Sequence, residues 1–279
     1  GVLILTPDAL LIRIAGMSAM DQVFWRGGLN ALAITLACIL IWRSETFARF
    51  KAVGAPGIVM ALLYAFSSIC FVTAMTMTSA ANVLIVVASS PLLSGLVSIV
   101  MLREMPPVST WVATIAALFG IAVVAGEQFQ LNAGTGELYA FGCAAAMAVK
   151  FNIIRRSKHV NMVPATALGA VFMAIAALAL SANPGTFPVP PSMTSLTALL
   201  ITGLIVLPVS FGAITIGPRY LPAPEVALLL LLETVMGPFW VWLVMEEAPS
   251  AYGLIGGVIV VGTLAVHALW SFRKDLRTA

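Results

Sequence analysis

The segment PAPEVALLLLLETVMGPFWVWLVMEEAP, residues 222–249, decides the fold class of this chain. Its apolar part, residues 223–245, is long enough to cross a membrane, because about 20 helical residues span the hydrocarbon core. Glu233 lies halfway along it. A carboxylate at that depth costs roughly 2.5 kcal/mol or more unless it is protonated, paired or hydrated. We therefore predict a membrane helix whose acid either marks a transport pathway or pairs with a neighbouring helix.

The residues after Glu233 predict a disturbance of this helix. Pro238, next to Gly237, removes a backbone donor, so we expect a helix break here. Trp240 follows two turns after Glu233 on the same face of the helix. We interpret Glu233, Gly237 and Trp240 as the acid, the gap and the aromatic wall of a binding site. Packing against lipid or another helix is the alternative role of Trp240.

The composition predicts an all-α membrane protein. Of 279 residues, 61% are hydrophobic and only 9% are charged, whereas a soluble domain of this size carries about 25% charged residues. The three cysteines lie in apolar stretches and form no metal-binding pattern. No GxxxxGK[ST] motif is present, so we expect no ATP hydrolysis by this chain. We expect no cofactor, no metal and no nucleic-acid partner; the lipid bilayer is the surrounding solvent.

Hydropathy and breaks at charged or Gly/Pro/Asn clusters divide the chain into ten predicted spans. Their expected ranges are 2–15, 24–42, 52–75, 81–102, 111–125, 138–154, 163–180, 196–217, 223–245 and 252–272. The connections between them are short, which leaves no room for a separate soluble domain. The chain starts at Gly1, and we expect the first span to lack its first several residues.

The basic residues are distributed asymmetrically between the predicted loops. Most of the 14 follow the even-numbered spans, namely Arg43, Arg49, Lys51, Arg103, Arg155, Arg156, Lys158, Arg219, Arg273, Lys274 and Arg277. Only Arg13 and Arg26 lie near the first loop on the other side. The positive-inside rule then predicts a multi-pass protein of the cell inner membrane with both termini in the cytoplasm.

The two halves of the chain share a weak internal repeat, which we assign to residues 1–126 and 134–274. The aligned pairs are Val83 with Val226, Glu104 with Glu247 and Pro106 with Pro249, and the same alignment pairs Ser67 with Ser210. Each half has five spans, an odd number, so the two repeats must be inverted in the membrane. Inverted repeats are typical of secondary transporters that bind substrate at the repeat interface near the midplane.

These repeat residues also resemble a known family. The residues that carry the resemblance are Pro222, Glu233, Glu247, Pro249 and Gly256 in the second half and Pro91, Glu104 and Pro106 in the first. The chain resembles the EamA-type ten-helix exporters of the drug/metabolite transporter superfamily. Thr234 departs from the family, which often has a proline after the acid. The overall texture is most similar to exporters of aromatic and other neutral amino acids, so the resemblance implies amino-acid export.

Other spans supply further candidate site residues. Pro91 predicts a second helix break, and Ser90 beside it contacts either substrate or its own backbone. Tyr64 and Ser67 lie on one helix face, which we expect to line a wet cavity or to serve packing, and Ser210 is the repeat counterpart of Ser67. Lys150 lies well inside a span, and we expect it to extend toward the cytoplasm or into a cavity rather than to pair with Asp8.

Three function classes remain open at this stage. A secondary transporter fits ten spans, inverted halves and a midplane acid. Its substrate would be a zwitterion with an apolar side chain, bound through a broken-helix N-terminus for its carboxylate and Glu233 for its ammonium. Hydrophobic cations or drugs are the alternative substrates, and an intramembrane enzyme or a scaffold subunit are the rival classes. Proton coupling and oligomeric state stay open.

Overall fold

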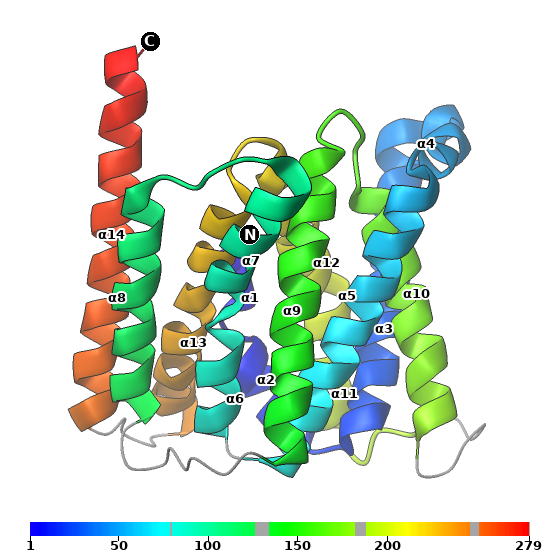
Figure 1. Ribbon diagram of the computed structural model, residues 1–279. Helices are drawn as coiled ribbons and strands as arrows, with labels where there is room; N and C mark the ends of the chain where they lie inside the picture. The colour runs from blue at the N-terminus through cyan, green and yellow to red at the C-terminus, as the bar shows by residue number, and fades with distance from the viewer. Residues whose placement is uncertain (79, 126–133, 182–187, 246–250, 279) are drawn as a thin grey trace.

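The structure is a computed structural model that describes residues 1–78, 80–125, 134–181, 188–245 and 251–278. All regular secondary structure in these ranges is helical, and no strand occurs in them. The helices form one bundle in which most axes run between the upper and lower edges of the view (Figure 1). The protein is therefore an all-α membrane protein, as the composition predicts.

The first half of the chain contributes five apolar segments. Its helices are α1 (Val2–Leu5), α2 (Asp8–Ala15), α3 (Ala19–Trp42), η1 (Arg43–Glu45), α4 (Thr46–Ala52), α5 (Gly54–Met77), α6 (Ala80–Val87), α7 (Ser90–Leu102) and α8 (Val108–Ala125). Helices α1 and α2 together replace the single predicted first span, because Pro7 between them cannot donate a backbone hydrogen bond.

The second half contributes five more segments. Its helices are α9 (Thr135–Arg156), α10 (Val163–Leu180), α11 (Met193–Ile201), η3 (Thr202–Val206), α12 (Leu207–Ile216), η4 (Gly217–Arg219), α13 (Ala223–Met245) and α14 (Ala251–Thr278). Among the described residues, 8 helical segments are long and apolar enough to cross a membrane, and Val108–Val124 is a shorter apolar helix. The predicted ranges 163–180 and 223–245 coincide with α10 and α13.

The two halves run in opposite directions through the bundle. Helix α3 rises to the upper edge of Figure 1, whereas α10, its counterpart in the second half, descends from that edge. Three pairs of counterparts pack directly against each other: α3 with α10, α7 with α13 and α8 with α14. The remaining contacts follow the same symmetry, since α5 packs on α9 while α11 and α12 pack on α2 and α1. The fold is thus a pair of inverted five-segment repeats.

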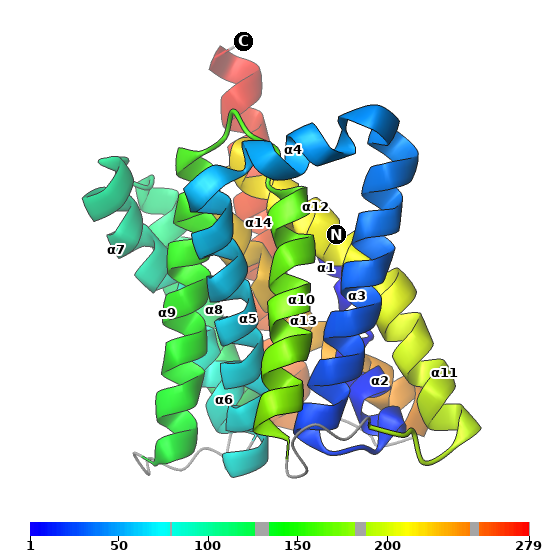
Figure 2. The same ribbon diagram turned by 90° about the vertical axis from the view of Figure 1, so that its right-hand side faces the viewer.

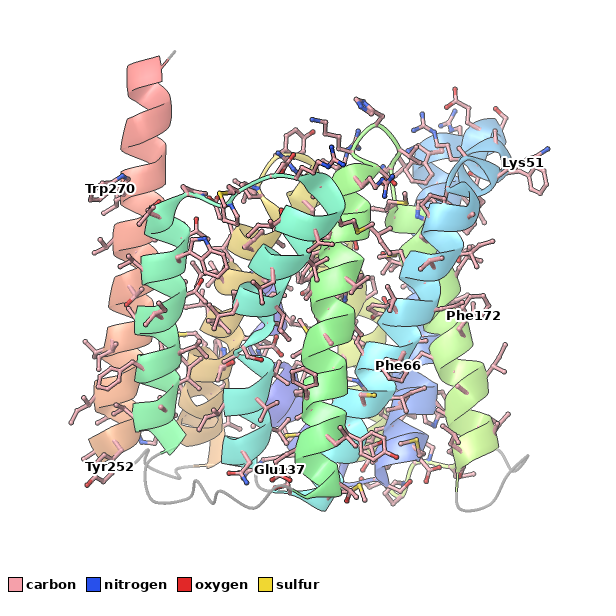
Figure 3. The ribbon with its side chains drawn as sticks, in the orientation of Figure 1. Lys51, Phe66, Glu137, Phe172, Tyr252 and Trp270 are labelled. Carbon is pink, nitrogen blue, oxygen red and sulfur yellow. The ribbon has the colours of Figure 1, made fainter. Side chains whose placement is uncertain are left out.

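Helix α4 lies across the upper edge of the bundle between α3 and α5 (Figure 2). Lys51 at its end marks this edge, and Glu137 on α9 marks the opposite one (Figure 3). Glu137 accepts hydrogen bonds from Thr78 at 2.5 Å and from Asn82 at 2.9 Å, which ties the start of α9 to the end of α5 and to α6. The upper edge of the bundle thus carries the basic residue Lys51, and the lower edge carries the acidic residue Glu137.

Small residues allow the closest helix contacts. A Cβ atom on Gly27 of α3 would lie 2.8 Å from the Ala170 carbonyl of α10, and one on Gly169 would lie 2.8 Å from the Ala61 carbonyl of α5. Gly120 of α8 and Gly256 of α14 approach each other in the same way. Membrane helices associate through such small residues because lipid provides little hydrophobic drive between them.

The two predicted helix breaks have different outcomes. The first-half segment is interrupted before Pro91, where α6 ends and α7 begins, and the Ser89 hydroxyl donates to the Val86 carbonyl at 2.6 Å. Helix α13 instead runs without interruption through Gly237 and Pro238, so the predicted break there is wrong. One proline removes a single backbone donor, and a long membrane helix that packs on α7 and α14 tolerates that loss.

Candidate functional site

Charged and aromatic side chains gather where the inner helices of the two halves meet. The helices that contribute them are α2, α3 and α5 from the first half and α9, α12 and α13 from the second. The predicted residues Tyr64, Ser67, Ser210, Glu233 and Trp240 lie on three of these helices. The central cluster, as we use the term, comprises the side chains of Asp8, Arg26, Asn30, Tyr64, Ser67, Lys150, Ser210, Phe211, Glu233 and Trp240.

Tyr64 of α5 is the hub of the central cluster. It is only 2% exposed, and its hydroxyl accepts a hydrogen bond of 3.1 Å from Nδ2 of Asn30 on α3. Its ring packs edge-on against Phe211 of α12, with the ring centroids 5.1 Å apart. Tyr64 therefore joins a polar contact on one side to an aromatic contact on the other, and it connects the two halves.

Lys150 of α9 projects toward the same aromatic rings. Its Nζ lies 5.2 Å from the centroid of Tyr64, 5.0 Å from that of Phe151 and 5.9 Å from that of Phe211. The residue is 4% exposed, so its side chain does not extend to the surface of the bundle. Within the described residues no carboxylate lies within ion-pair distance of it. Lys150 is a buried cation surrounded by aromatic faces.

Asp8 and Arg26 form a bidentate ion pair between α2 and α3. The two guanidinium nitrogens Nη1 and Nη2 donate to Oδ1 and Oδ2 of Asp8, each at 2.7 Å. The side chains are 13% exposed for Arg26 and 7% for Asp8. Arg26, which the sequence places near the first loop, lies in the second turn of α3, which begins at Ala19, and its side chain points into the bundle toward Asp8. Asp8 thus pairs with Arg26 and not with Lys150, and the sequence also predicts that Asp8 and Lys150 do not pair.

Glu233 of α13 is half-buried at the edge of the central cluster. The charges of Asp8 and Arg26 lie close enough to interact with it. Cys143 of α9 is near both Glu233 and Lys150. Among described residues, Glu233 has no hydrogen-bond or ion-pair partner. The acid thus lies beside the ion pair without being neutralised by a direct contact.

Trp240 connects α13 to the break in the first span. Its indole Nε1 donates to the Thr6 hydroxyl at 2.8 Å, and Thr6 itself donates to the Leu3 carbonyl at 2.9 Å. Because Thr6 lies between α1 and α2, the indole holds this break against α13. The contact gives Trp240 a structural partner in addition to its predicted role as an aromatic wall.

The three predicted serines have different surroundings. Ser67 donates to the Tyr64 carbonyl of its own helix at 3.0 Å, so its hydroxyl is satisfied locally. Ser210 is completely buried, and its Oγ has no hydrogen-bond partner. Ser90 is 1% exposed at the start of α7, directly before Pro91. The predicted symmetric pair of Ser67 and Ser210 is therefore not equivalent in hydrogen bonding.

Sequence reasoning missed two residues of the central cluster, Asn30 and Phe211. Asn30 is 0% exposed, and its Oδ1 has no hydrogen-bond partner. An asparagine in the middle of an apolar span is itself the signal that would have found it. Phe211 carried no such signal, because its role depends on the contact between α12 and Tyr64 of α5.

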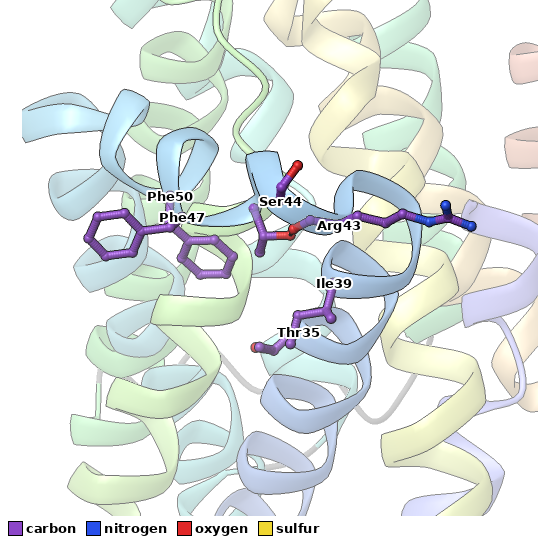
Figure 4. Close-up of a pocket in the computed structure, with 7 residues that line it drawn as sticks. Thr35, Ile39, Arg43, Ser44, Phe47 and Phe50 are labelled. Atoms are coloured by element: carbon purple, nitrogen blue, oxygen red, sulfur yellow. The ribbon is translucent and has the colours of Figure 1, made fainter.

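A separate pocket lies at the edge of the bundle beside η1 and α4 (Figure 4). Its volume is about 470 Å³. The residues that line it are Thr35, Ile39, Arg43, Ser44, Thr46, Phe47 and Phe50. It shares no residue with the central cluster and is mostly apolar.

Comparison with known proteins defines the class. The profile of the EamA-like transporter family matches the chain twice, over residues 9–126 and 134–268. The protein is a membrane transporter of the drug/metabolite transporter superfamily, and the chain belongs to the EamA-like transporter family.

The fold itself has a solved counterpart. A crystal structure described only as "Crystal structure of protein" superimposes with a TM-score of 0.79 at 20% sequence identity, covering 96% of this chain and 95% of the other. At that identity the likeness shows the fold alone. No curated protein matches the chain.

Proposed function

We propose that this protein exports small neutral amino acids, including aromatic and other apolar ones, across the cell inner membrane by alternating access. The transporter class follows from the family, and the substrate class is our inference. The basic edge that carries Lys51 would face the cytoplasm, in keeping with the positive-inside rule. The substrate would bind at the central cluster, where α5, α9, α12 and α13 meet.

One observation supports this substrate class above others. The central cluster contains two basic and two acidic side chains, and Asp8 and Arg26 neutralise each other. Lys150 and Glu233 remain without an ion-pair partner among the described residues. One positive group surrounded by aromatic rings and one negative group elsewhere in the same cluster match a zwitterion that carries an apolar side chain. Charged residues inside membrane bundles commonly mark substrate or ion pathways.

Alternative substrates fit the cluster less well. Sugar phosphates and nucleotides carry fixed negative charge and call for several cationic groups, and in the described part of the central cluster Lys150 is the one basic side chain without an ion-pair partner. Hydrophobic cations would suit Glu233 and the aromatic rings, but they would approach the buried ammonium of Lys150. A neutral amino acid avoids both conflicts.

Uptake of labelled phenylalanine and threonine into proteoliposomes tests this proposal. Liposomes that contain the purified full chain should accumulate both amino acids faster than empty liposomes. Uptake of labelled tetraphenylphosphonium, measured in parallel, distinguishes amino-acid transport from transport of hydrophobic cations. Uptake of the cation alone, or no amino-acid uptake above empty liposomes, would contradict the proposed substrate class.

A further inference from the structure

Three aromatic rings surround the ammonium group of Lys150. The Nζ lies between 5.0 and 5.9 Å from three ring centroids, contributed by α5, α9 and α12. Two of these rings, Tyr64 and Phe211, also pack against each other. We call Tyr64, Phe151 and Phe211 the aromatic cage. The cage fixes the ammonium at the junction of the two halves.

The cage does not satisfy the ammonium. Aromatic faces attract a cation but accept no strong hydrogen bonds, and Lys150 has three donors. A buried charge without a counter-charge is unfavourable. In the part of the chain that the structure describes, neither a carboxylate nor a hydrogen-bond acceptor meets Lys150. An anionic ligand would supply both the missing charge and the missing acceptors.

The surroundings of the cage fix the polarity of such a ligand. Tyr64 carries the hydrogen bond from Asn30, whose Oδ1 is a buried acceptor without a partner. The negative groups Asp8 and Glu233 lie near this side, where Arg26 already neutralises Asp8. The acceptors Asn30 Oδ1 and Glu233 lie on one side, and the unpaired cation Lys150 lies on the other. This arrangement suits a molecule that carries an ammonium and a carboxylate close together.

We propose that Lys150 and its aromatic cage form the carboxylate subsite of the transport site. This inference rests on the proposed function and adds a rule of substrate selection. The carboxylate of the substrate binds Lys150, and its ammonium binds Glu233 and the side-chain Oδ1 of Asn30. The aromatic rings contact the apolar side chain of the substrate. Amines that lack the carboxylate are rejected because they leave the Lys150 charge unmatched.

Competition for labelled phenylalanine uptake tests the subsite in wild-type proteoliposomes. Unlabelled phenylalanine should inhibit uptake, whereas phenethylamine, which lacks only the carboxylate, should inhibit about tenfold to a hundredfold more weakly, as the loss of a charged hydrogen bond implies. Inhibition by phenethylamine as strong as that by phenylalanine would overturn the inference. This competition experiment uses only the wild-type protein, so its result does not depend on whether a variant folds.

Substitution of the lysine gives the second arm. Lys150→Gln should lower phenylalanine uptake about tenfold or more and remove the preference over phenethylamine, while Lys150→Arg should retain part of both. Lys51→Gln is the matched control, since Lys51 is an exposed lysine at the bundle edge. Gel filtration and thermal unfolding check that each variant is folded.

The outcomes separate this inference from the proposed function. If wild type transports phenylalanine and a folded Lys150→Gln variant does so equally well with the same selectivity, the subsite is overturned while amino-acid export stands. If wild type transports no amino acid, both are overturned. Loss of uptake in Lys150→Gln with retention in Lys51→Gln supports the subsite.

Discussion

Asp8 and Arg26 illustrate what single residues contribute to this bundle. Removing one member of a buried ion pair leaves the other uncompensated and costs on the order of 3–5 kcal/mol. We expect Asp8→Asn to lower the melting temperature in detergent strongly. Glu45→Gln is the control, because the Glu45–Arg49 pair is 65% and 43% exposed and such pairs contribute about 0.5 kcal/mol. Equal melting temperatures of the two variants would contradict a stabilising buried pair.

Glu233 determines how transport responds to pH in our account. The groups that face it are Asp8 and Arg26 from α2 and α3 and Cys143 from α9. If Glu233 carries a proton during the cycle, Glu233→Gln fixes it in the neutral form and should abolish the pH dependence of uptake. Uptake rates measured across the neutral pH range check this. Unchanged pH dependence in the variant would make Glu233 a binding or structural residue.

Some of the charged and polar residues inside the bundle could be recognised from the sequence, and others could not. Tyr64 and Glu233 could be singled out from the sequence because a polar or acidic group inside an apolar span is unfavourable unless it is paired or hydrated. Arg26 was not, because hydropathy alone placed the span start at residue 24 and left the arginine at the membrane surface. Only the contact with Asp8 of α2 explains how a charge lies inside the bundle.

At the scale of helices, the contact between α8 and α14 depends on glycine. A Cβ on Gly256 would collide with the Gly120 carbonyl and lie 2.6 Å from the Val124 nitrogen. We expect Gly256→Ala to destabilise the protein by about 1–3 kcal/mol. Gly262→Ala on the same helix is the control, since a Cβ there meets nothing within 4 Å. Unfolding in a denaturing detergent series measures both, and equal stability would contradict this packing.

The helix breaks show why element boundaries were only partly predictable. Proline was read as a break at both Pro91 and Pro238, but only the first interrupts its helix. Next to Pro91, the Ser89 hydroxyl donates a hydrogen bond to the Val86 carbonyl, which takes the place of a helical backbone hydrogen bond. No hydroxyl lies directly before Pro238, where Gly237 precedes it. The break therefore depends on the neighbouring side chains as well as on the proline.

The whole molecule is two inverted halves, and the odd number of spans in each half made this predictable. The orientation that we propose can be tested with single cysteines in a background without Cys38, Cys70 and Cys143. Ser44→Cys at the basic edge should react with a membrane-impermeant maleimide only after cells are opened. Thr135→Cys at the opposite edge should react in intact cells. Both positions are exposed, and the reverse pattern of labelling would contradict the orientation.

If an amino acid bound at the central cluster is carried across the membrane by alternating access, the protein should catalyse counterflow. Proteoliposomes are loaded with unlabelled phenylalanine and diluted into labelled phenylalanine. We expect a transient accumulation of label above that in unloaded proteoliposomes and in loaded liposomes without protein. Label that enters loaded and unloaded proteoliposomes at the same rate, or no faster than empty liposomes, would contradict it.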